Sequence, residues 1–394
     1  MNILHIVNGR IPRDPSHTPV SGVAFAAIKL AEKQLSMGHN VNLVSVSNES
    51  FITQWKNMTL YSLQEWPRAK WSLGNKTVDL RIHAPLILLT HKHNFDIIHG
   101  HQYTYFRLLK ANRFYAHFHS DPYHSGGSAL ESLDYKKDDW ISVARYSSGY
   151  FAASKYLRSQ IIRGGLEARK IRVVPNGIDI EKFQQNLNVS EIRNFRRDWN
   201  FNYNDYVFLF VGAISREKGV MELVQCFKYV LKKQKNAKLL IVGASSLWGT
   251  KTSSMSDYEA LVRKFTLCQI PRRSITWAGK ILNNFMPIVY ASVDAVVAPS
   301  LVGEGFHLVT LEAMASGKPV IGSELGGIGE MLYPSNGLLI SPFRPRTLVN
   351  AMTILAGNIY SGKALGHHAQ KSAQAYTWQR AADIVEHVYT KDMK

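Results

Sequence analysis

The chain has 394 residues, enough for two domains of ordinary size, and its 45% hydrophobic and 19% charged residues are typical of a folded globular protein. It has two cysteines, Cys226 and Cys268, which argues against a disulfide scaffold or a multi-cysteine metal site and favours a reducing cytoplasm. The net charge of +18 suits phosphorylated substrates, an anionic membrane or nucleic acid, but no common nucleic-acid-binding motif is present, so nucleic acid is not expected as a partner.

The N-terminal half alternates strands with helices. Residues 2–7 predict a strand rather than a signal peptide, because their apolar run is too short. A helix is predicted over 23–37, ended by Gly38, and a strand follows at 41–46. Further strands are predicted at 97–99, 114–118, 150–152 and 172–174. No stretch of the chain approaches the roughly 18 apolar residues that a membrane-spanning helix needs.

The C-terminal half repeats this pattern after a polar interval at 184–205. A strand at 206–211 and an amphipathic helix at 220–232 begin it. Strands are then predicted at 239–242, 275–277, 294–298, 320–321 and 338–340, and a last helix at 376–388. The alternation predicts an α/β protein with two doubly wound, Rossmann-like halves, so the cleft between them is the expected ligand site.

Two carboxylates, Glu304 and Glu312, stand eight residues apart at a strand-to-helix junction. Glu304 is predicted on the loop beyond the strand, and Glu312 one to two turns into the helix that Gly317 and Pro319 end. Ligands bind at this rim in open α/β sheets, where a loop carboxylate can hold sugar hydroxyls and a helical one a ribose diol. Alternatively, Glu304 is a solvated charge and Glu312 only favours the helix N-terminus.

A glycine-bounded loop follows the strand at 206–211. Gly212 and Gly219 allow a close backbone approach. Arg216 can offer a diphosphate the forked donors of its guanidinium, and Lys218 the compact charge of its ammonium group. The loop lacks the Walker spacing, and a solvated basic loop is the alternative interpretation.

The string EGFHLVTLEAMASGKPVI, which begins at Glu304, resembles the signature of the retaining nucleotide-sugar glycosyltransferases of family 4, of the bacterial surface-polysaccharide type. The resemblance implies the GT-B fold, with two facing Rossmann-like doubly wound domains and a C-terminal helix that crosses back to the N-terminal domain. It implies acceptor binding by residues 1–178 with the crossing helix 376–394, and donor binding by residues 179–375.

The resemblance also assigns roles to single residues. It places Arg216 and Lys218 at the donor diphosphate, Glu304 at the sugar and Glu312 at the ribose. His307 stands where the family usually has glycine, so its side chain could narrow the pocket or add a hydrogen bond. The donor-binding positions that also carry over are Gly22, Gly212, Lys280, Ile281, His307, Leu308 and Val309.

Five histidines cluster near the ends of two predicted strands: His99, His101, His117, His119 and His124. Neutral imidazoles ligate metals, but no carboxylate or cysteine completes a ligand set, and strand alternation also fits buried structural histidines. His119 matches the family histidine near the reacting sugar, which implies a contact with the donor's 6-hydroxyl or with a polar group of the acceptor. The expected catalytic set is His119, Glu304, Arg216 and Lys218, with no metal, because the chain has no Asp-x-Asp motif.

Residues 55–71 combine three tryptophans with Lys56, Arg68 and Lys70. Aromatic and basic residues together suit a membrane interface, and a surface loop that packs its tryptophans inward is the alternative.

The sequence therefore predicts a metal-independent, retaining hexosyltransferase without a cofactor. Its expected partners are a nucleotide sugar, with UDP-glucose or a similar UDP-sugar as the best candidate, and a glycan or lipid-linked acceptor of polysaccharide biosynthesis. It is expected in the cytoplasm, with possible peripheral contact with an anionic membrane. The rival hypotheses are a non-catalytic nucleotide-sugar-binding module on the same fold and a phosphorylase or hydrolase-like enzyme, whose cofactor-lysine string is missing.

Overall fold

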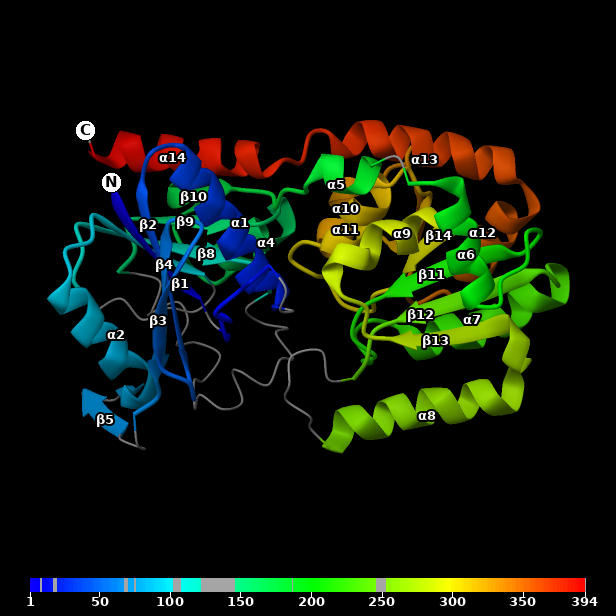
Figure 1. Ribbon diagram of the computed structural model, residues 1–394, viewed down its shortest axis with the longest axis horizontal. Coiled ribbons are helices and arrows are strands. Elements are labelled where there is room, and N and C mark those ends of the chain that lie inside the picture. The colour runs from blue at the N-terminus through cyan, green and yellow to red at the C-terminus, as the bar shows by residue number, and fades with distance from the viewer. Residues whose placement is uncertain are drawn as a thin grey trace. The chain divides into compact units, whose positions relative to one another are not determined.

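The computed structural model describes residues 1–7, 9–16, 20–66, 70–73, 76–101, 108–121, 146–185, 187–245 and 253–393. The chain forms two compact units (Figure 1). Unit 1 comprises Met1–Gly177 together with Trp378–Lys394, and unit 2 comprises Ile178–Thr377.

Unit 1 is built on a sheet of eight strands in the order β10-β9-β8-β7-β1-β2-β4-β3. The strands are β1 (Asn2–Val7), β2 (Asn40–Ser47), β3 (Phe51–Trp55), β4 (Met58–Gln64), β7 (Ile97–His101), β8 (Arg113–Phe118), β9 (Gly149–Ala152) and β10 (Ile171–Val173). All pairs are parallel except β3 with β4. The strands that follow β1 extend to one edge, and the chain then returns to place β7 on the other side of β1.

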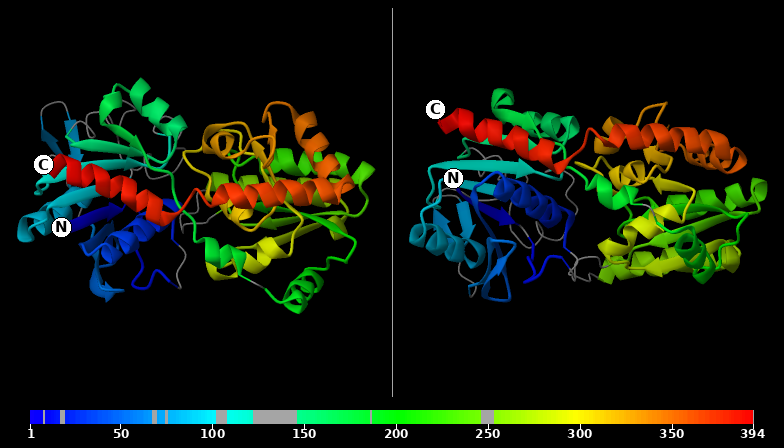
Figure 2. Two further views of the ribbon diagram at one scale, coloured as in Figure 1. Left: turned by 90° about the horizontal axis from the view of Figure 1, so that it is seen from above. Right: turned by 45° about the horizontal axis from the view of Figure 1, so that its top comes forward.

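The helices of unit 1 are α1 (Gly22–Ser36), α2 (Leu80–Lys92), α4 (Lys155–Arg163) and α14 (Trp378–Met393), and a small hairpin joins β5 (Lys70–Leu73) to β6 (Lys76–Asp79). The Ser21 hydroxyl caps α1 by accepting from the Ala24 N–H. The C-terminal helix α14 packs beside α1, and its Val385 and Tyr389 join Ile3 of β1 in one buried cluster (Figure 2). The expected return of the last helix to the N-terminal domain is confirmed.

Unit 2 has a parallel sheet in the order β13-β12-β11-β14-β15-β16. The strands are β11 (Tyr206–Val211), β12 (Ala237–Val242), β13 (Ile275–Gly279), β14 (Ala295–Ala298), β15 (Val320–Ser323) and β16 (Leu338–Ile340). The helices are α5 (Ile180–Gln184), α6 (Val189–Asp198), α7 (Val220–Lys233), α8 (Ser253–Gln269), α9 (Met286–Ala291), α10 (Leu308–Ala315), α11 (Gly326–Met331), α12 (Pro345–Gly357) and α13 (Ile359–Ala373).

Strand β11 shows why this sheet is buried on both faces. Phe208 and Phe210 enter a cluster formed with α7 and α12, while Val207 and Leu209 enter a second cluster formed with α9 and α10. A strand covered by helices on both sides needs apolar residues at every position rather than at alternate ones. That continuous apolar run is what made β11 predictable.

The structure differs from the surface-loop alternative given for residues 55–71. Trp55 ends strand β3 and residues 58–64 form β4, so this part of the tryptophan-rich segment is a β-hairpin and not a loop. Lys56 (φ 49°) and Asn57 (φ 63°) make the two-residue turn, whose paired positive φ angles match the twist of the strands. Arg68 lies outside the described residues.

Candidate active site

The strand order of unit 2 reverses between β11 and β14. The chain moves outward from β11 through β12 to β13, and then resumes on the other side of β11 with β14, β15 and β16. The loops that follow β11 and β14 therefore leave the same edge of the sheet in opposite directions, and a ligand crevice forms at such a point. Lys218 lies on the first loop and Glu304 on the second.

The two loops are held by backbone contacts. The Leu301 N–H donates to the Glu217 carbonyl at 2.8 Å, and the Gly327 N–H donates to the Glu304 carbonyl at 2.8 Å. Gly219 has φ +68°, and a Cβ at that position would lie 2.1 Å from the Pro299 carbonyl oxygen. Only glycine allows this approach, so the loop spacing is fixed by the backbone.

Lys218 and Glu304 form an ion pair across the two loops, with side chains 26% and 20% exposed. The Ser300 hydroxyl donates to the other Glu304 oxygen at 2.5 Å, and His307 Nε2 lies 3.6 Å from that oxygen. Burial alone would raise the pKa of the Glu304 carboxyl, but Lys218, His307 and Ser300 together lower it to about 2. Glu304 is therefore ionised at every physiological pH.

His307 caps α10, a role that the sequence prediction missed. Its Nδ1 accepts from the Thr310 N–H at 3.2 Å and lies 2.9 Å from the Thr310 hydroxyl. Burial lowers the pKa of His307 to about 4, against the attraction of Glu304, so the ring is neutral. With Nδ1 accepting, the proton is on Nε2, which faces Glu304.

Glu312 lies on α10 and accepts from the Tyr290 hydroxyl at 2.8 Å. Burial raises the pKa of Glu312 to about 7, although the Tyr290 hydrogen bond opposes the shift. The carboxyl group is thus near the midpoint of its titration at neutral pH, where its ionised and protonated forms are similarly populated.

The remaining predicted donor-site residues occupy different positions in unit 2. Arg216 is exposed, and its guanidinium makes no hydrogen bond or ion pair with another described residue. Lys280 is exposed just after β13, and Ile281 packs against the cluster below α9 and α10. Leu308 and Val309 open α10, and Gly212 directly follows β11. The structure brings Lys218 and His307 to the Glu304 carboxylate.

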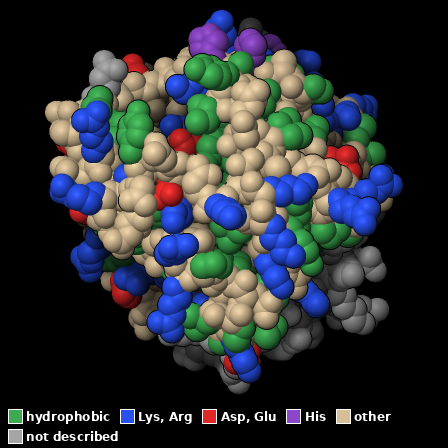
Figure 3. Space-filling model, turned by 90° about the vertical axis from the view of Figure 1, so that its right-hand side faces the viewer, with side chains coloured by type: hydrophobic (Ala, Val, Ile, Leu, Met, Phe, Trp, Pro, Cys, Tyr) green, Lys and Arg blue, Asp and Glu red, His purple; other side chains and the backbone are tan. Residues whose placement is uncertain are grey.

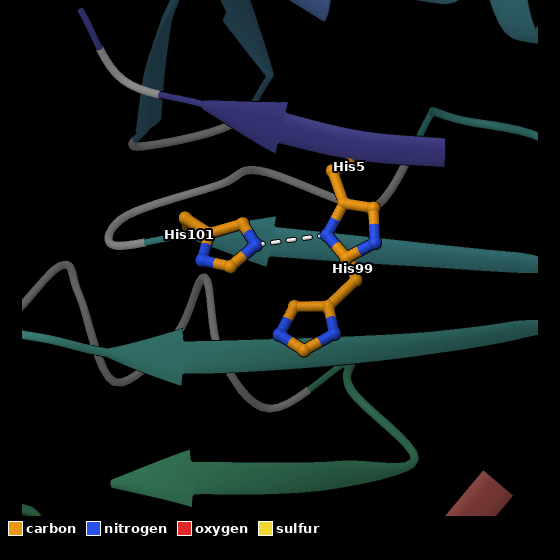
Figure 4. A group of neighbouring side chains, drawn as sticks. All are labelled: His5, His99 and His101. Atoms are coloured by element: carbon orange, nitrogen blue, oxygen red, sulfur yellow. Dashed lines mark hydrogen bonds between the residues drawn. The ribbon is translucent and has the colours of Figure 1, made fainter. Parts of the chain in front are cut away.

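Unit 1 has its own reversal, between β1 and β7, and histidines gather there (Figure 4). His5 of β1 is paired in register with His99 of β7, and His101 of β7 with His117 of β8. His119 follows β8 directly, and all five side chains are buried. The sequence prediction missed His5, because its strand register was not known, and His124 lies outside the described residues.

Hydrogen bonds join these imidazoles. His5 Nδ1 lies 2.9 Å from His101 Nε2, and His101 Nδ1 lies 2.9 Å from His119 Nε2. Burial lowers the pKa of His5 to about 4 and that of His119 to about 3, and it holds the pKa of His99, His101 and His117 well below the usual range. The cluster is therefore neutral at physiological pH. Gly22, the predicted phosphate contact of this unit, is exposed as the first residue of α1.

The two units match family models of known enzymes. Residues 20–182 match the model described as Glycosyltransferase Family 4, and residues 205–358 match the model described as Glycosyl transferases group 1. The chain is a glycosyltransferase of these families. The resemblance inferred from the string at Glu304 is confirmed.

Relatives and solved structures agree with this assignment. An uncharacterized glycosyltransferase of Methanocaldococcus jannaschii is 28% identical over 393 residues, with 94% of each chain covered. A lipopolysaccharide 1,2-N-acetylglucosaminetransferase of Salmonella typhimurium is 32% identical over 170 residues, which is 42% of each chain.

Sucrose-phosphate synthase from Thermosynechococcus elongatus superposes with a TM-score of 0.81 at 20% identity, covering 100% of this chain and 99% of its own. Anabaena HepE, solved in complex with UDP-glucose, superposes with a TM-score of 0.75 at 19% identity, covering 99% of this chain and 100% of its own. The fold is GT-B, as expected.

The neutral histidine cluster predicts a steep loss of stability in acid. A histidine whose folded pKa is lowered contributes stability that is complete above its unfolded pKa of about 6.5 and is lost as the pH falls below it. At one unit below 6.5 each such histidine costs about 1.4 kcal/mol, so the five together cost several kcal/mol. Calorimetric scans should show a first unfolding temperature that falls sharply from pH 6.5 to pH 5.

Two variants separate the cluster from other titrating groups. His117→Asn removes one buried imidazole and should make the pH slope shallower, whatever its effect at pH 8. His367→Asn removes an exposed histidine and should leave the slope unchanged. A flat unfolding temperature between pH 7 and pH 5 would show that the cluster is not neutral in the folded protein.

Proposed function

We propose that this glycosyltransferase is a retaining enzyme that moves a hexose from a nucleotide sugar to a glycan or lipid-linked acceptor of polysaccharide biosynthesis, with UDP-glucose or a close relative as donor. The observation that carries the proposal is the Lys218–Glu304 pair at the strand reversal of unit 2, with Glu312 on the helix that follows. HepE, which shares the fold, was solved with UDP-glucose, and the relative from Salmonella is named for lipopolysaccharide synthesis.

Lys218 would bind the donor diphosphate and leave Glu304 to accept hydrogen bonds from the sugar hydroxyls. The exchange is favourable because a diphosphate carries more negative charge than a carboxylate. Exposed Arg216 can add a forked contact. Helix α10 supplies two further donors, since the N–H groups of Leu308 and Val309 precede the first intrahelical bond, which Leu311 donates to His307.

These groups could perform the reaction without a metal. Lys218 and Arg216 would stabilise the charge that develops on the leaving diphosphate, whose oxygen takes the proton of the attacking acceptor hydroxyl on the same face of the sugar. That order retains the anomeric configuration. Glu312 would hold the ribose rather than act as a second catalytic carboxylate, because it is hydrogen-bonded to Tyr290 in the α9–α10 layer.

A donor panel tests this function. We expect turnover with a UDP-hexose, detected as nucleoside diphosphate released only when a glycan or lipid-linked acceptor is present, and unchanged to within about tenfold in excess chelator, which is a barrier change of ~1.4 kcal/mol. Mass analysis of the product identifies the sugar and the linkage.

Three outcomes of the panel count against parts of the proposal. Preference for a GDP- or ADP-sugar contradicts the choice of donor, and a loss restored by magnesium or manganese contradicts metal independence. Nucleotide-sugar binding with no release under any acceptor would favour the non-catalytic module.

The two glutamates should separate nucleotide binding from sugar transfer. Glu312→Gln weakens the acceptor of the ribose hydroxyls, so calorimetry with UDP alone should show a loss of roughly 1.5–3 kcal/mol, which is the usual worth of a charge-assisted hydrogen bond. Glu304→Gln releases Lys218 from its ion pair, so UDP should bind at least as tightly as before while turnover falls. Equal losses of UDP affinity in both variants would show that the roles are assigned wrongly.

A surface of unit 1 suits contact with an anionic membrane at the cytoplasmic face. A groove of about 870 Å³ between the β3–β4 hairpin and α2 is bordered by Ile52, Trp66 and Leu88, which are 69%, 45% and 58% exposed, and by Lys92. The net charge of the chain is +18, and Figure 3 shows Lys and Arg side chains scattered over the face of unit 2 that it draws. Among the described helices, none is both long and apolar enough to cross a bilayer.

Vesicle co-sedimentation measures this contact. Binding to anionic vesicles at low salt should exceed binding to neutral vesicles and weaken as salt is added, since each basic residue near the surface contributes about 1 kcal/mol. Trp66→Ser should reduce binding, while Tyr360→Ser, which removes an 85% exposed aromatic side chain from unit 2, should not. Equal effects of the two substitutions, or no binding at low salt, would exclude this surface.

A further inference from the structure

The buried histidines of unit 1 form two hydrogen-bonded rows. In the first row, Gln34 Oε1 lies 2.6 Å from His5 Nε2, and the His5–His101 and His101–His119 contacts continue it to the carboxyl edge of the sheet. In the second row, the Tyr389 hydroxyl lies 2.5 Å from His99 Nδ1, and His99 Nε2 lies 3.2 Å from His117 Nδ1. The family assignment gives no role to His5, His101 or Gln34.

The geometry is that of a hydrogen-bond chain and not of a metal site. The nitrogen atoms of either His5, His99 and His101 or His101, His117 and His119 lie within 4.8 Å of one another, close enough for a metal by distance alone. The rings are stacked, however: the planes of His99 and His101 differ by 9° with centroids 4.6 Å apart. Along the first row the nitrogens meet in pairs at 2.9 Å, whereas metal ligation needs lone pairs that converge on one point.

A chain of neutral imidazoles has a direction. Each ring has one N–H donor and one lone pair, so the group at one end determines every tautomer in the row. Gln34 Oε1 can only accept, which requires His5 to donate from Nε2 and to accept at Nδ1. His101 must then donate from Nε2 to His5, and His119 from Nε2 to His101. His119 thereby presents the lone pair of Nδ1.

Gln34 is suited to hold that end fixed. It is fully buried on α1 among apolar residues, where the hydrogen bond between its oxygen and His5 offsets part of the cost of burying the amide. The Gln34 oxygen faces His5 at 2.6 Å, while the amide nitrogen is buried and makes no hydrogen bond with another described residue. The opposite orientation of this one amide would reverse the donors along the first row.

We propose that Gln34 is a positioning residue that acts through His5 and His101 to hold His119 in the Nε2–H tautomer, with Nδ1 as a hydrogen-bond acceptor at the sheet edge. A lone pair there can accept a hydrogen bond from a hydroxyl group, whereas an N–H would donate one to the hydroxyl oxygen. The identity of this hydroxyl group, on a donor sugar or on an acceptor glycan, depends on the proposed function. The tautomer itself does not.

Nitrogen-15 NMR of the histidine-labelled full chain reads the tautomers directly, without any substrate. In the wild type, His5, His101 and His119 should all show a protonated Nε2 and an unprotonated Nδ1. Gln34→Glu keeps an acceptor at this position and should preserve the pattern. Gln34→Met has a similar volume but no acceptor, and should mix or reverse the tautomers of all three rings. Ile28→Val, a buried change on the same helix within the apolar cluster of Val7 and Val41, is the matched control.

Activity gives the second readout. Gln34→Met should lower kcat tenfold or more with little change in the KM for the nucleotide sugar, and Gln34→Glu should restore most of it. Protonated Nδ1 atoms in the wild type overturn the proposal, as do unchanged tautomers in Gln34→Met. Stoichiometric zinc binding that converts these rings to ligands also overturns it. If no transfer activity is found with any donor, the proposed function fails while the tautomer measurement still decides this inference, and the wild-type spectrum suffices even if Gln34→Met does not fold.

Discussion

Strand reversal in a parallel sheet is the constraint on which both polar sites depend. Between β11 and β14, two loops leave the same sheet edge in opposite directions, and a ligand crevice forms at such a point. Gly219 allows the first loop to pack against the Pro299 carbonyl of the second. This close backbone contact places Lys218 and Glu304 within ion-pair distance. Had either loop kept its distance, the two charges would be solvated separately and would not form a partly buried pair.

The Lys218–Glu304 pair also sets the cost of binding an anion. Burying both charges has a desolvation cost, which their mutual attraction offsets. That attraction is lost when a phosphate binds Lys218 in place of Glu304. Glu304 then still accepts from the Ser300 hydroxyl and faces the His307 N–H. The carboxylate is thus left with enough donors to stay ionised, and its remaining lone pairs can bind hydroxyl groups. The proposed nucleotide-sugar donor would supply both the anion and the hydroxyl groups.

Sequence patterns predicted the central strands, because β11 and β14 are apolar throughout and end in polar loops. The same patterns placed Glu304 on the loop after β14 and Glu312 on the helix that follows. The β3–β4 hairpin was not predicted, since Ile52 is exposed on an edge strand and the Lys56–Asn57 turn lacks the usual glycine. The histidine cluster was found only in part. His5 stands 94 residues before His99, and their pairing becomes visible only when the sheet order places β1 beside β7.

His307 shows what a side chain does at a position where the family usually has glycine. A glycine would leave the Thr310 N–H open to a ligand, whereas here His307 Nδ1 occupies it. The anion-binding capacity of α10 is therefore reduced to the N–H groups of Leu308 and Val309. In exchange, the Nε2–H of the neutral ring faces the Glu304 carboxylate from 3.6 Å away. If a diphosphate binds at this site as proposed, Lys218 and Arg216 would therefore contribute more of the positive charge that holds it than α10 does.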